Sequence, residues 1–397
     1  MILLGKLKPV ALFCIISLFW GVLVGSIDLL VPFIKHAFEL DFRQAMQLQT
    51  YFFAAFLFFT LPMGVLVKYA SFVFTIRFAL VLTTIGSFLI ALSGGFAQWI
   101  LTCFAVLIVA TGVVLMQLSF PSYLSVNYPK QLVASRITLV QGFLALGTVI
   151  APIFSSTFLR HVDSTYGVSA DAIFLPYICL SLIFILLFSL SRYVEFNRQA
   201  KVTDTFQLSI YFDVLHRSRA IRLGMIGLFF YVGAEIAIGS MLFDYLLSHS
   251  ESMFDAAMAS KLVSCYWGGI MLGRFVGFWA LPKINICKAL MVSALFAILL
   301  TLYVSFGSGW TSAMAIIAVG LCNSIMGPTI YTSAIHDLGE NIAIGSSLLI
   351  MSVFGGGIIG FVQAVIADLV TIPISFLVPC LSYFVILLVG YKFYKYS

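Results

Sequence analysis

The chain has 397 residues, of which 62% are hydrophobic and only 9% are charged, and its mean hydropathy is +1.12. A soluble domain needs far more polar surface, so the composition excludes a soluble protein and indicates one that crosses a membrane many times. The net charge of +6 does not indicate a nucleic-acid partner, because basic residues that anchor the chain to anionic membrane lipid explain it.

Apolar stretches of about 20 residues, the length that crosses a bilayer, predict twelve transmembrane helices and an all-α fold. The first stretch follows basic residues, as in a signal peptide, but it is too long and no cleavage site follows it. We therefore interpret it as a helix of the folded protein. In chain order the predicted helices are 9–35, 45–67, 72–92, 98–120, 132–158, 172–191, 222–247, 256–280, 286–306, 310–332, 342–367 and 372–394.

The positions of lysine and arginine predict how the helices are oriented. If both termini are cytoplasmic, most of the 21 lysines and arginines, Arg274 among them, fall on the inner side. This asymmetry is typical of a multi-pass protein of the inner (plasma) membrane. The basic residues assigned to the outer side are Lys35, Arg43, Arg160 and Lys261.

One long charged connection, residues 192–221, interrupts the apolar pattern. It predicts a six-helix bundle over 1–191, a cytoplasmic linker over 192–221 and a second six-helix bundle over 222–397. The later part of the linker is amphipathic, so we expect it to lie on the inner leaflet. A weak internal repeat, "SFPSY" (119–123) against "MGPTIY" (326–331), supports a duplication. Two such halves around a cytoplasmic linker are how the major facilitator fold is built.

Several helices carry motifs of a known family within that fold. The motifs cover most of the chain and are most specific in its second half. They are "SIDLLVP" (26–32), "RITLVQGFLALG" (136–147), "YVGAEIAIGS" (231–240), "YWGGIMLGRFVG" (266–277), "GLCNSIMGPTI" (320–330) and "GSSLLIMSVFGGGIIGFVQAVIAD" (345–368). The chain resembles the fucose–galactose–glucose:proton symporters, especially their glucose/galactose branch. The resemblance implies a twelve-helix transporter that moves a sugar together with a proton.

The first half departs from that family at polar positions. The family's Asn before the acid of the first helix is Ile27 here. A Glu and an Asn of the fourth helix are replaced by Met116 and Phe120, and two Asn positions of the fifth helix are Thr138 and Leu144. Groups that would bind hydroxyls are therefore missing, which predicts a broken or rebuilt sugar pocket in this half.

Two carboxylates fall well inside predicted helices, whereas nearly all of the other acids lie in loops or at helix ends. A charged carboxylate at membrane depth costs several kcal/mol unless it is paired, hydrated or protonated. Asp28 matches the acid of the family's first helix, which implies proton coupling. We expect Glu235 to face a central cavity as a proton or substrate ligand, although a static hydrogen bond that fixes its helix is the alternative. We expect Asp244 to be hydrated, and Lys261 to reach the outer interface or to pair with an acid.

Neutral polar side chains inside the helices are the candidates for binding the solute. Amides offer both donors and acceptors, which suits a hydroxyl-rich ligand, and an indole ring can stack on a sugar face. Amides also bridge helices in membrane proteins, and a tryptophan can simply pack between helices, so both alternatives stay open. The predicted substrate-binding residues are Gln49, Gln117, Gln141, Trp267, Asn323 and Gln363.

The sequence contains no nucleotide-binding loop, no metal-ligand cluster and no nucleophile–base pair, so we expect neither an enzyme nor a cofactor. The hypothesis is a secondary active transporter that imports a sugar or similar small polar solute with protons and acts as a monomer in the lipid bilayer. Sodium could replace the proton. The alternatives are the same fold with a non-sugar cargo, an exporter, or a non-transporting nutrient sensor.

Overall fold

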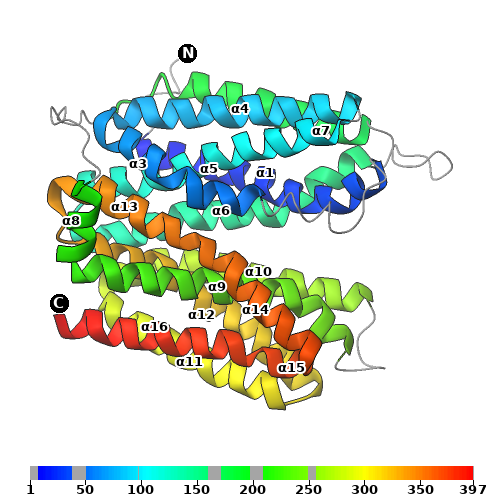
Figure 1. The fold of residues 1–397 in the computed structure, drawn as a ribbon, viewed down its shortest axis with the longest axis vertical. Coiled ribbons are helices and arrows are strands. Elements are labelled where there is room, and N and C mark those ends of the chain that lie inside the picture. The colour runs from blue at the N-terminus through cyan, green and yellow to red at the C-terminus, as the bar shows by residue number, and fades with distance from the viewer. Residues whose placement is uncertain are drawn as a thin grey trace. The chain divides into compact units, whose positions relative to one another are not determined.

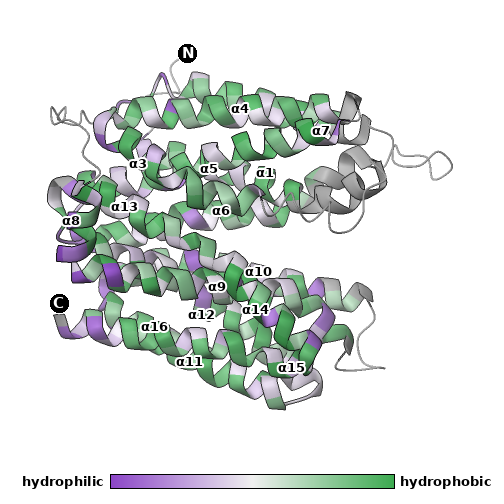
Figure 2. Ribbon diagram, in the orientation of Figure 1, coloured by the Kyte–Doolittle hydropathy of each residue, from purple (hydrophilic) through white to green (hydrophobic). Residues whose placement is uncertain are grey.

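The structure is a computed structural model, and it describes residues 8–37, 51–96, 98–159, 171–196, 209–248 and 256–396. Every regular element within these ranges is a helix (Figure 1). Nine helices in the described ranges are long and apolar enough to cross a membrane, and one bent pair would make ten. Hydrophobic residues dominate the long helices, whereas hydrophilic residues gather around α8 and near several helix ends (Figure 2).

The helices of the first half follow the predicted order closely. A short helix, Tyr51–Phe58, meets α3 at a bend of 48°. The sequence predicts one continuous helix over 45–67, but Pro62 lacks a backbone N–H and its ring crowds the preceding turn, which accounts for the break near Phe59. The long helices here are α1 (Pro9–Ala37), α3 (Thr60–Tyr69), α4 (Phe72–Phe96), α5 (Trp99–Asn127), α6 (Lys130–Leu159) and α7 (Asp171–Leu190).

The second half begins with α8 (Ser209–Arg217), an amphipathic helix that buries Tyr211 and Val214 and exposes Phe212. The predicted helix 342–367 is divided by a short 3-10 turn immediately before three consecutive glycines. The remaining elements are α9 (Arg219–Ser248), α10 (Ala256–Ala280), η1 (Leu281–Lys283), α11 (Ile286–Phe306), α12 (Gly309–Ile335), η2 (Gly339–Asn341), α13 (Ile342–Met351), η3 (Ser352–Phe354), α14 (Gly355–Leu369), α15 (Ile372–Ser375) and α16 (Leu377–Tyr396).

The chain groups into two compact units. Unit 1 contains residues 1–123 and 143–206, and unit 2 contains residues 124–142 and 207–397. The first part of α6 therefore belongs to unit 2, and its remainder belongs to unit 1. The predicted division at residues 192–221 stays a prediction.

Glycines let helices approach closely at two places. In unit 1, a side chain on Gly21 or Gly147 would collide with the backbone of the facing helix, so α1 and α6 touch backbone to backbone. In unit 2, a side chain on Gly355 would collide with the Phe229 carbonyl of α9. We predict a packing role for the 355–357 glycines, and the contact at Gly355 fits that role.

Candidate functional site

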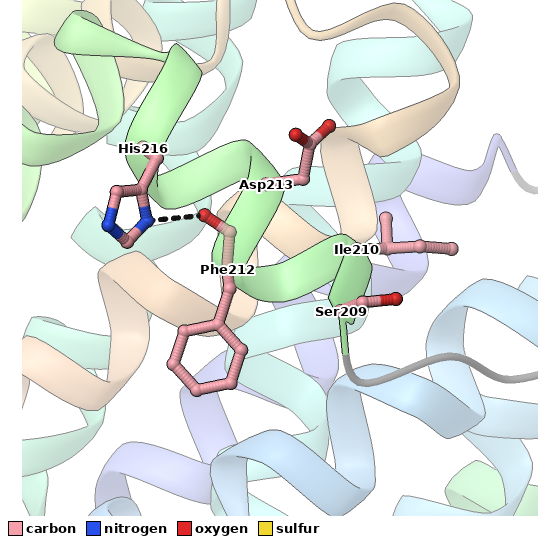
Figure 3. Close-up of a pocket in the computed structure, with 5 residues that line it drawn as sticks. All are labelled: Ser209, Ile210, Phe212, Asp213 and His216. Atoms are coloured by element: carbon pink, nitrogen blue, oxygen red, sulfur yellow. Dashed lines mark hydrogen bonds between the residues drawn. The ribbon is translucent and has the colours of Figure 1, made fainter.

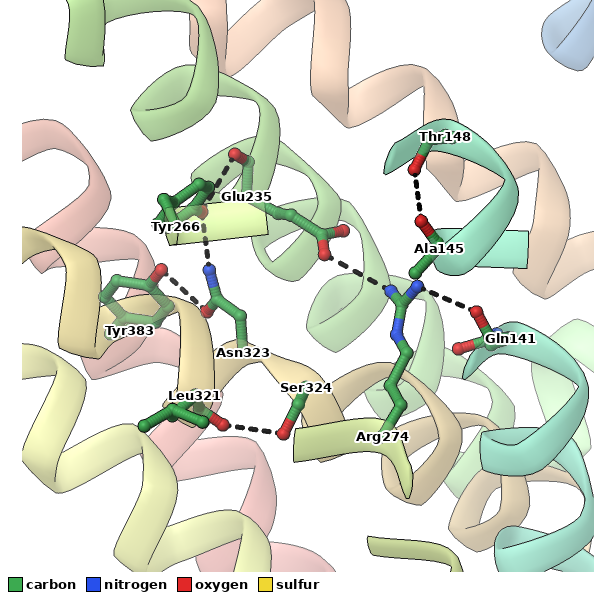
Figure 4. A network of polar contacts seen from close by, with 10 residues as sticks. All are labelled: Gln141, Ala145, Thr148, Glu235, Tyr266, Arg274, Leu321, Asn323, Ser324 and Tyr383. Carbon is green, nitrogen blue, oxygen red and sulfur yellow. Dashed lines mark hydrogen bonds and ion pairs between the residues drawn. The ribbon is translucent and has the colours of Figure 1, made fainter. Parts of the chain in front are cut away.

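The carboxylate of Glu235 lies midway along α9 and forms an ion pair with Arg274 of α10. The Arg274 Nη2 donates to Glu235 Oε1 at 3.4 Å, and the two side chains are only 10% and 12% exposed. Such a pair is tolerated in an apolar setting because the attraction between the two charges offsets their desolvation cost. Removing one partner would leave the other as an unpaired buried charge. Figure 4 shows the two side chains pointing toward each other.

Arg274 also contacts a third helix. Its Nη1 donates to the backbone carbonyl of Gln141 at 3.2 Å, in the part of α6 that belongs to unit 2. The residue is buried within α10, six residues before the helix ends at Ala280. The predicted inner side for Arg274 stays a prediction.

A chain of hydrogen bonds leads from α16 to the backbone of Glu235. Tyr383 donates to Asn323 Oδ1 at 2.8 Å, Asn323 Nδ2 donates to the Tyr266 hydroxyl at 3.0 Å, and Tyr266 donates to the Glu235 carbonyl at 3.3 Å. All three side chains are buried. Asn323 is a predicted site residue, whereas sequence reasoning missed both tyrosines, because nothing in their spacing pairs them with residue 323.

Tyr231 completes the surroundings of the ion pair from within α9. Its hydroxyl interacts electrostatically with both Glu235 and Arg274. Neither that hydroxyl nor the Arg274 Nε has a hydrogen-bond partner of good geometry among the described residues.

Of the other predicted residues of unit 2, Gln363 bonds outside this chain of contacts, whereas the Trp267 ring meets the Tyr266 ring edge-on with ring centroids 5.3 Å apart. Gln363 is fully buried, its Nε2 donates to Ser375 at 3.3 Å, and its Oε1 has no hydrogen-bond partner among the described residues. The ring of Trp267 packs over Gly239, where an added Cβ would lie 2.5 Å from the indole. Gly239 of α9 therefore makes room for the indole.

The predicted site residues of unit 1 are Asp28, Gln49 and Gln117. Gln49 lies outside the described residues. Asp28 lies in α1, but its side chain is also outside the description, and Gln117 is half-buried in α5. On the surface of unit 2, Asp244 and Lys261 are both exposed, which fits the predicted hydration of the first and exposure of the second.

The replaced family positions of unit 1 are occupied by apolar packing. Phe120 stacks on Phe13 with ring centroids 4.2 Å apart, and Tyr123 meets the same Phe13 ring edge-on. Met116 is 1% exposed in the same helix. The side chains of Phe120 and Met116 cannot donate a hydrogen bond to a solute hydroxyl.

A surface hollow of about 520 Å³ lies beside α8 (Figure 3). Its lining comes from one face of that helix and includes Phe212, Asp213 and His216. None of the predicted site residues lines it, and it is separate from the Glu235–Arg274 pair. Among the described residues, no group of three or more His, Cys, Asp or Glu side chains could hold a metal ion.

Comparison with known proteins places this arrangement in a family. The major facilitator superfamily model matches residues 11–361. A glucose/galactose transporter of Brucella abortus is 33% identical over 370 residues, which cover 92% of this chain and 89% of that protein. The L-fucose-proton symporter of Escherichia coli is 27% identical over 405 residues and covers 95% of this chain and 91% of that protein.

A solved structure agrees with these sequence relatives. The crystal structure of the transporter FucP in its outward conformation superposes with a TM-score of 0.89 at 26% identity, covering 97% of this chain and 98% of that one. The match confirms the predicted fold class and the predicted resemblance, and it identifies a multi-pass transporter and not an enzyme. The chain therefore belongs to the major facilitator superfamily, in the group that contains the glucose/galactose transporters and the L-fucose-proton symporters.

Proposed function

We propose that the protein is a proton-coupled secondary active transporter that imports a sugar or similar small polar solute by alternating access. The observation that carries this proposal is the buried Glu235 carboxylate, paired with Arg274, in a fold whose relatives are named glucose/galactose transporter and L-fucose-proton symporter. A carboxylate at membrane depth is stable either as a paired anion or as a neutral acid. Proton coupling requires a group that is stable both with and without its proton, and such a carboxylate meets this requirement.

We assign proton coupling to Asp28 and Glu235. Asp28 is supported by its place in the first transmembrane helix, in the motif "SIDLLVP" that resembles the family's acidic motif. Glu235 is supported by its burial and by its single ionic partner among the described residues. Sodium is the alternative coupling ion, because carboxylates bind it as well.

We assign solute binding to the amides and the indole, with Gln363 as the residue best able to accept a hydrogen bond. Its Oε1 is buried and has no partner within the described part of the chain. Asn323 uses one donor and one acceptor on the two tyrosines and keeps one of each. Gln141, Trp267, Gln117 and Gln49 complete the proposed set.

A less hydroxylated solute is the second candidate, and one observation favours it. Phe120 and Met116 present apolar packing where the family has polar groups. A solute hydroxyl left without a partner against such a surface costs about 1–3 kcal/mol. A sugar cargo should therefore bind weakly, or should depend on Gln141, Asn323 and Gln363. Tight glucose or fucose binding that survives replacement of all three amides by Ala would contradict this assignment.

The proposed setting is the inner membrane, with both termini in the cytoplasm and one chain as the working unit. The amphipathic α8 supports this orientation, because Phe212 is exposed beside His216 and Arg217, as expected at the inner leaflet. Cysteines placed next to Lys8 and Lys395 should react with an impermeant maleimide only in inside-out vesicles.

Proteoliposomes test the function directly. A thermal-shift screen across sugars, polyols and organic acids first identifies a stabilising solute. Uptake of that solute should follow an inward proton gradient and should collapse when a protonophore is added. Uptake that follows sodium, or that ignores both gradients, would overturn proton coupling.

A further inference from the structure

The first part of α6 is fastened to α10 by a small set of contacts within unit 2. Ser135 Oγ donates to the Phe278 carbonyl at 2.7 Å, and the Arg136 guanidinium lies over the Phe278 ring. Thr138 is fully buried against Gly277, where an added Cβ would lie 3.2 Å from the threonine methyl group. The fourth contact is the hydrogen bond from Arg274 to the Gln141 carbonyl.

Only the last of these four contacts involves a side chain that also binds a titratable carboxylate, that of Arg274. Arg274 divides its two terminal nitrogens between the Glu235 carboxylate and the Gln141 carbonyl. The other titratable groups that interact with Glu235 are the tyrosines Tyr231, Tyr266 and Tyr383, which are neutral phenols near pH 7. Arg274 is therefore the one cation that faces this carboxylate among the described groups.

We propose that Arg274 is a positioning residue that fastens the first part of α6 to α9 and α10 only while the Glu235 carboxylate is charged. The proposal rests on the function above, in which Glu235 takes up a proton. When Glu235 is neutral, Arg274 remains as a buried cation without a counter-charge, and this state is costly in an apolar environment. The guanidinium then withdraws toward water, and the Gln141 carbonyl loses its donor.

The consequence is a link between proton uptake and the mobility of one helix. Loss of the Arg274 contact leaves α6 held to α10 by Ser135, the ring contact of Arg136 and the packing of Thr138. A lost buried hydrogen bond raises the population of the opened contact by about tenfold, which corresponds to about 1.4 kcal/mol. Protonation of Glu235 thus loosens the surface on which α6 and α10 meet.

Cysteine labelling at Thr138 tests this proposal. The seven native cysteines, none of which is in a disulfide, are replaced by Ser or Ala, and Thr138→Cys is introduced. The maleimide labelling rate is measured on purified protein in lipid nanodiscs, without solute or gradient. We expect the rate to rise about tenfold with Glu235→Gln, which carries no charge, and by a similar factor with Arg274→Gln. The double variant should match the single ones, because both changes release the same contact.

Thr301→Cys is the matched control. Like Thr138, Thr301 is fully buried in a helix of unit 2 and bonds to the carbonyl four residues earlier. Its labelling should not change in either variant. Arg274→Lys gives a second check, because one ammonium group cannot reproduce the two-armed contact, so labelling at position 138 should rise with the charge retained.

Three results would overturn the proposal: unchanged labelling at position 138, an equal increase at position 301, or additive effects in the double variant. Because the assay uses no solute and no gradient, its outcome is separate from that of transport. If labelling responds as expected but transport does not depend on protons, the role of the Arg274 contact stands and the proposed function is wrong. If transport depends on protons but labelling does not respond, the proposed function stands and the role of the contact is wrong.

Discussion

The centres of the two units are built from different chemistry. Around α5 in unit 1, aromatic rings pack on one another, with Phe120 stacked on Phe13 and Tyr123 against Phe72 and Phe196. In unit 2, α9, α10, α12 and α16 instead bury an ion pair and a chain of hydrogen bonds through Asn323. Apolar contacts stabilise the fold but cannot bind a proton or a solute hydroxyl. The polar groups of unit 2 can stabilise the fold and can also bind such ligands. The chemistry of the described residues is thus concentrated in unit 2.

This contrast matches most of the pattern of retained and lost family residues, although Thr138, a replaced position, lies in unit 2. Unit 1 has exchanged polar positions for Met116 and Phe120, whose side chains are buried. Unit 2 keeps the "YVGAEIAIGS" and "GLCNSIMGPTI" motifs, which contribute Glu235 and Asn323 to one connected network. Substitutions in the two units should therefore have different signatures, and the largest effects should come from the ion pair.

Breaking the ion pair should have the largest effect on stability. Arg274→Met should lower the free energy of unfolding by about 3–5 kcal/mol at neutral pH, because it strands a buried carboxylate. The double variant Glu235→Leu with Arg274→Met should recover most of that loss, since neither charge remains. Denaturant titration in detergent measures both values. A double variant as unstable as the single one would show that packing, and not charge, determines the loss.

Removing the central amide of unit 2 should have a somewhat smaller effect. Asn323→Leu has a similar branched shape, but it removes the acceptor of the Tyr383 hydroxyl and the donor to the Tyr266 hydroxyl. At about 1–3 kcal/mol for each stranded group, the expected loss is about 2–4 kcal/mol. Adding Tyr383→Phe should restore part of it, as measured in the same titration. Strictly additive losses would argue against a connected network.

A substitution in the aromatic centre of unit 1 should be milder and functionally silent. Phe120→Leu removes the stacking on Phe13 and should cost about 1 kcal/mol. Solute affinity should stay within about twofold, because this ring lies in packing and not in a polar site. A large loss of affinity would show that the aromatic cluster contacts the solute. It would contradict the view that only unit 2 provides the chemistry of the site.

The smallest effect should come from the exposed charges where α12 ends. Partial burial would raise the pKa of Asp337, but the His336 ring at 2.6 Å and the Lys130 ammonium at 3.4 Å hold it below its ordinary value. Stability from this group is therefore present above its unfolded pKa of about 3.9 and is lost as the pH falls through the folded value. Asp337→Asn should cost less than about 1 kcal/mol, because the group is solvent-exposed.

That small difference should disappear as the pH falls from about 5 to about 2, because the wild-type carboxyl then becomes neutral like the amide. Thermal unfolding of the wild type and Asp337→Asn across this range measures it. A difference that grows as the pH falls below about 5 would contradict the assigned sign.

Hydropathy was enough to predict most of the helices, because a bilayer demands long apolar segments with internally bonded backbones. The break near Phe59 and the turn before Gly355 were missed, since both depend on local backbone geometry that hydropathy does not register. The sequence singles out Glu235 as an unusual carboxylate but does not identify Arg274 as its partner. A count of positive charges gives each arginine a side of the membrane and says nothing about which side chain it contacts.

The contacts of Asn323 show where sequence reasoning ends. The residue was predicted as a site residue from its family motif, yet its partners lie 57 and 60 positions away in the chain. No periodicity brings Tyr266, Asn323 and Tyr383 together, because their meeting depends on how α10, α12 and α16 pack. Likewise, the contact from Arg274 to a backbone carbonyl of α6 could not be predicted from residue types, because every residue has a backbone carbonyl.

The most direct test of the account compares solute counterflow with proton-driven uptake in proteoliposomes, for the wild type, Asp28→Asn and Glu235→Gln. Counterflow requires binding and reorientation but no net proton movement, whereas accumulation requires the carboxylate to release its proton on one side. We predict that both variants retain counterflow and lose accumulation, because an amide resembles the neutral acid and cannot ionise. A Glu235→Gln protein that accumulates solute like the wild type would contradict the role of Glu235, and the same result for Asp28→Asn would contradict the role of Asp28.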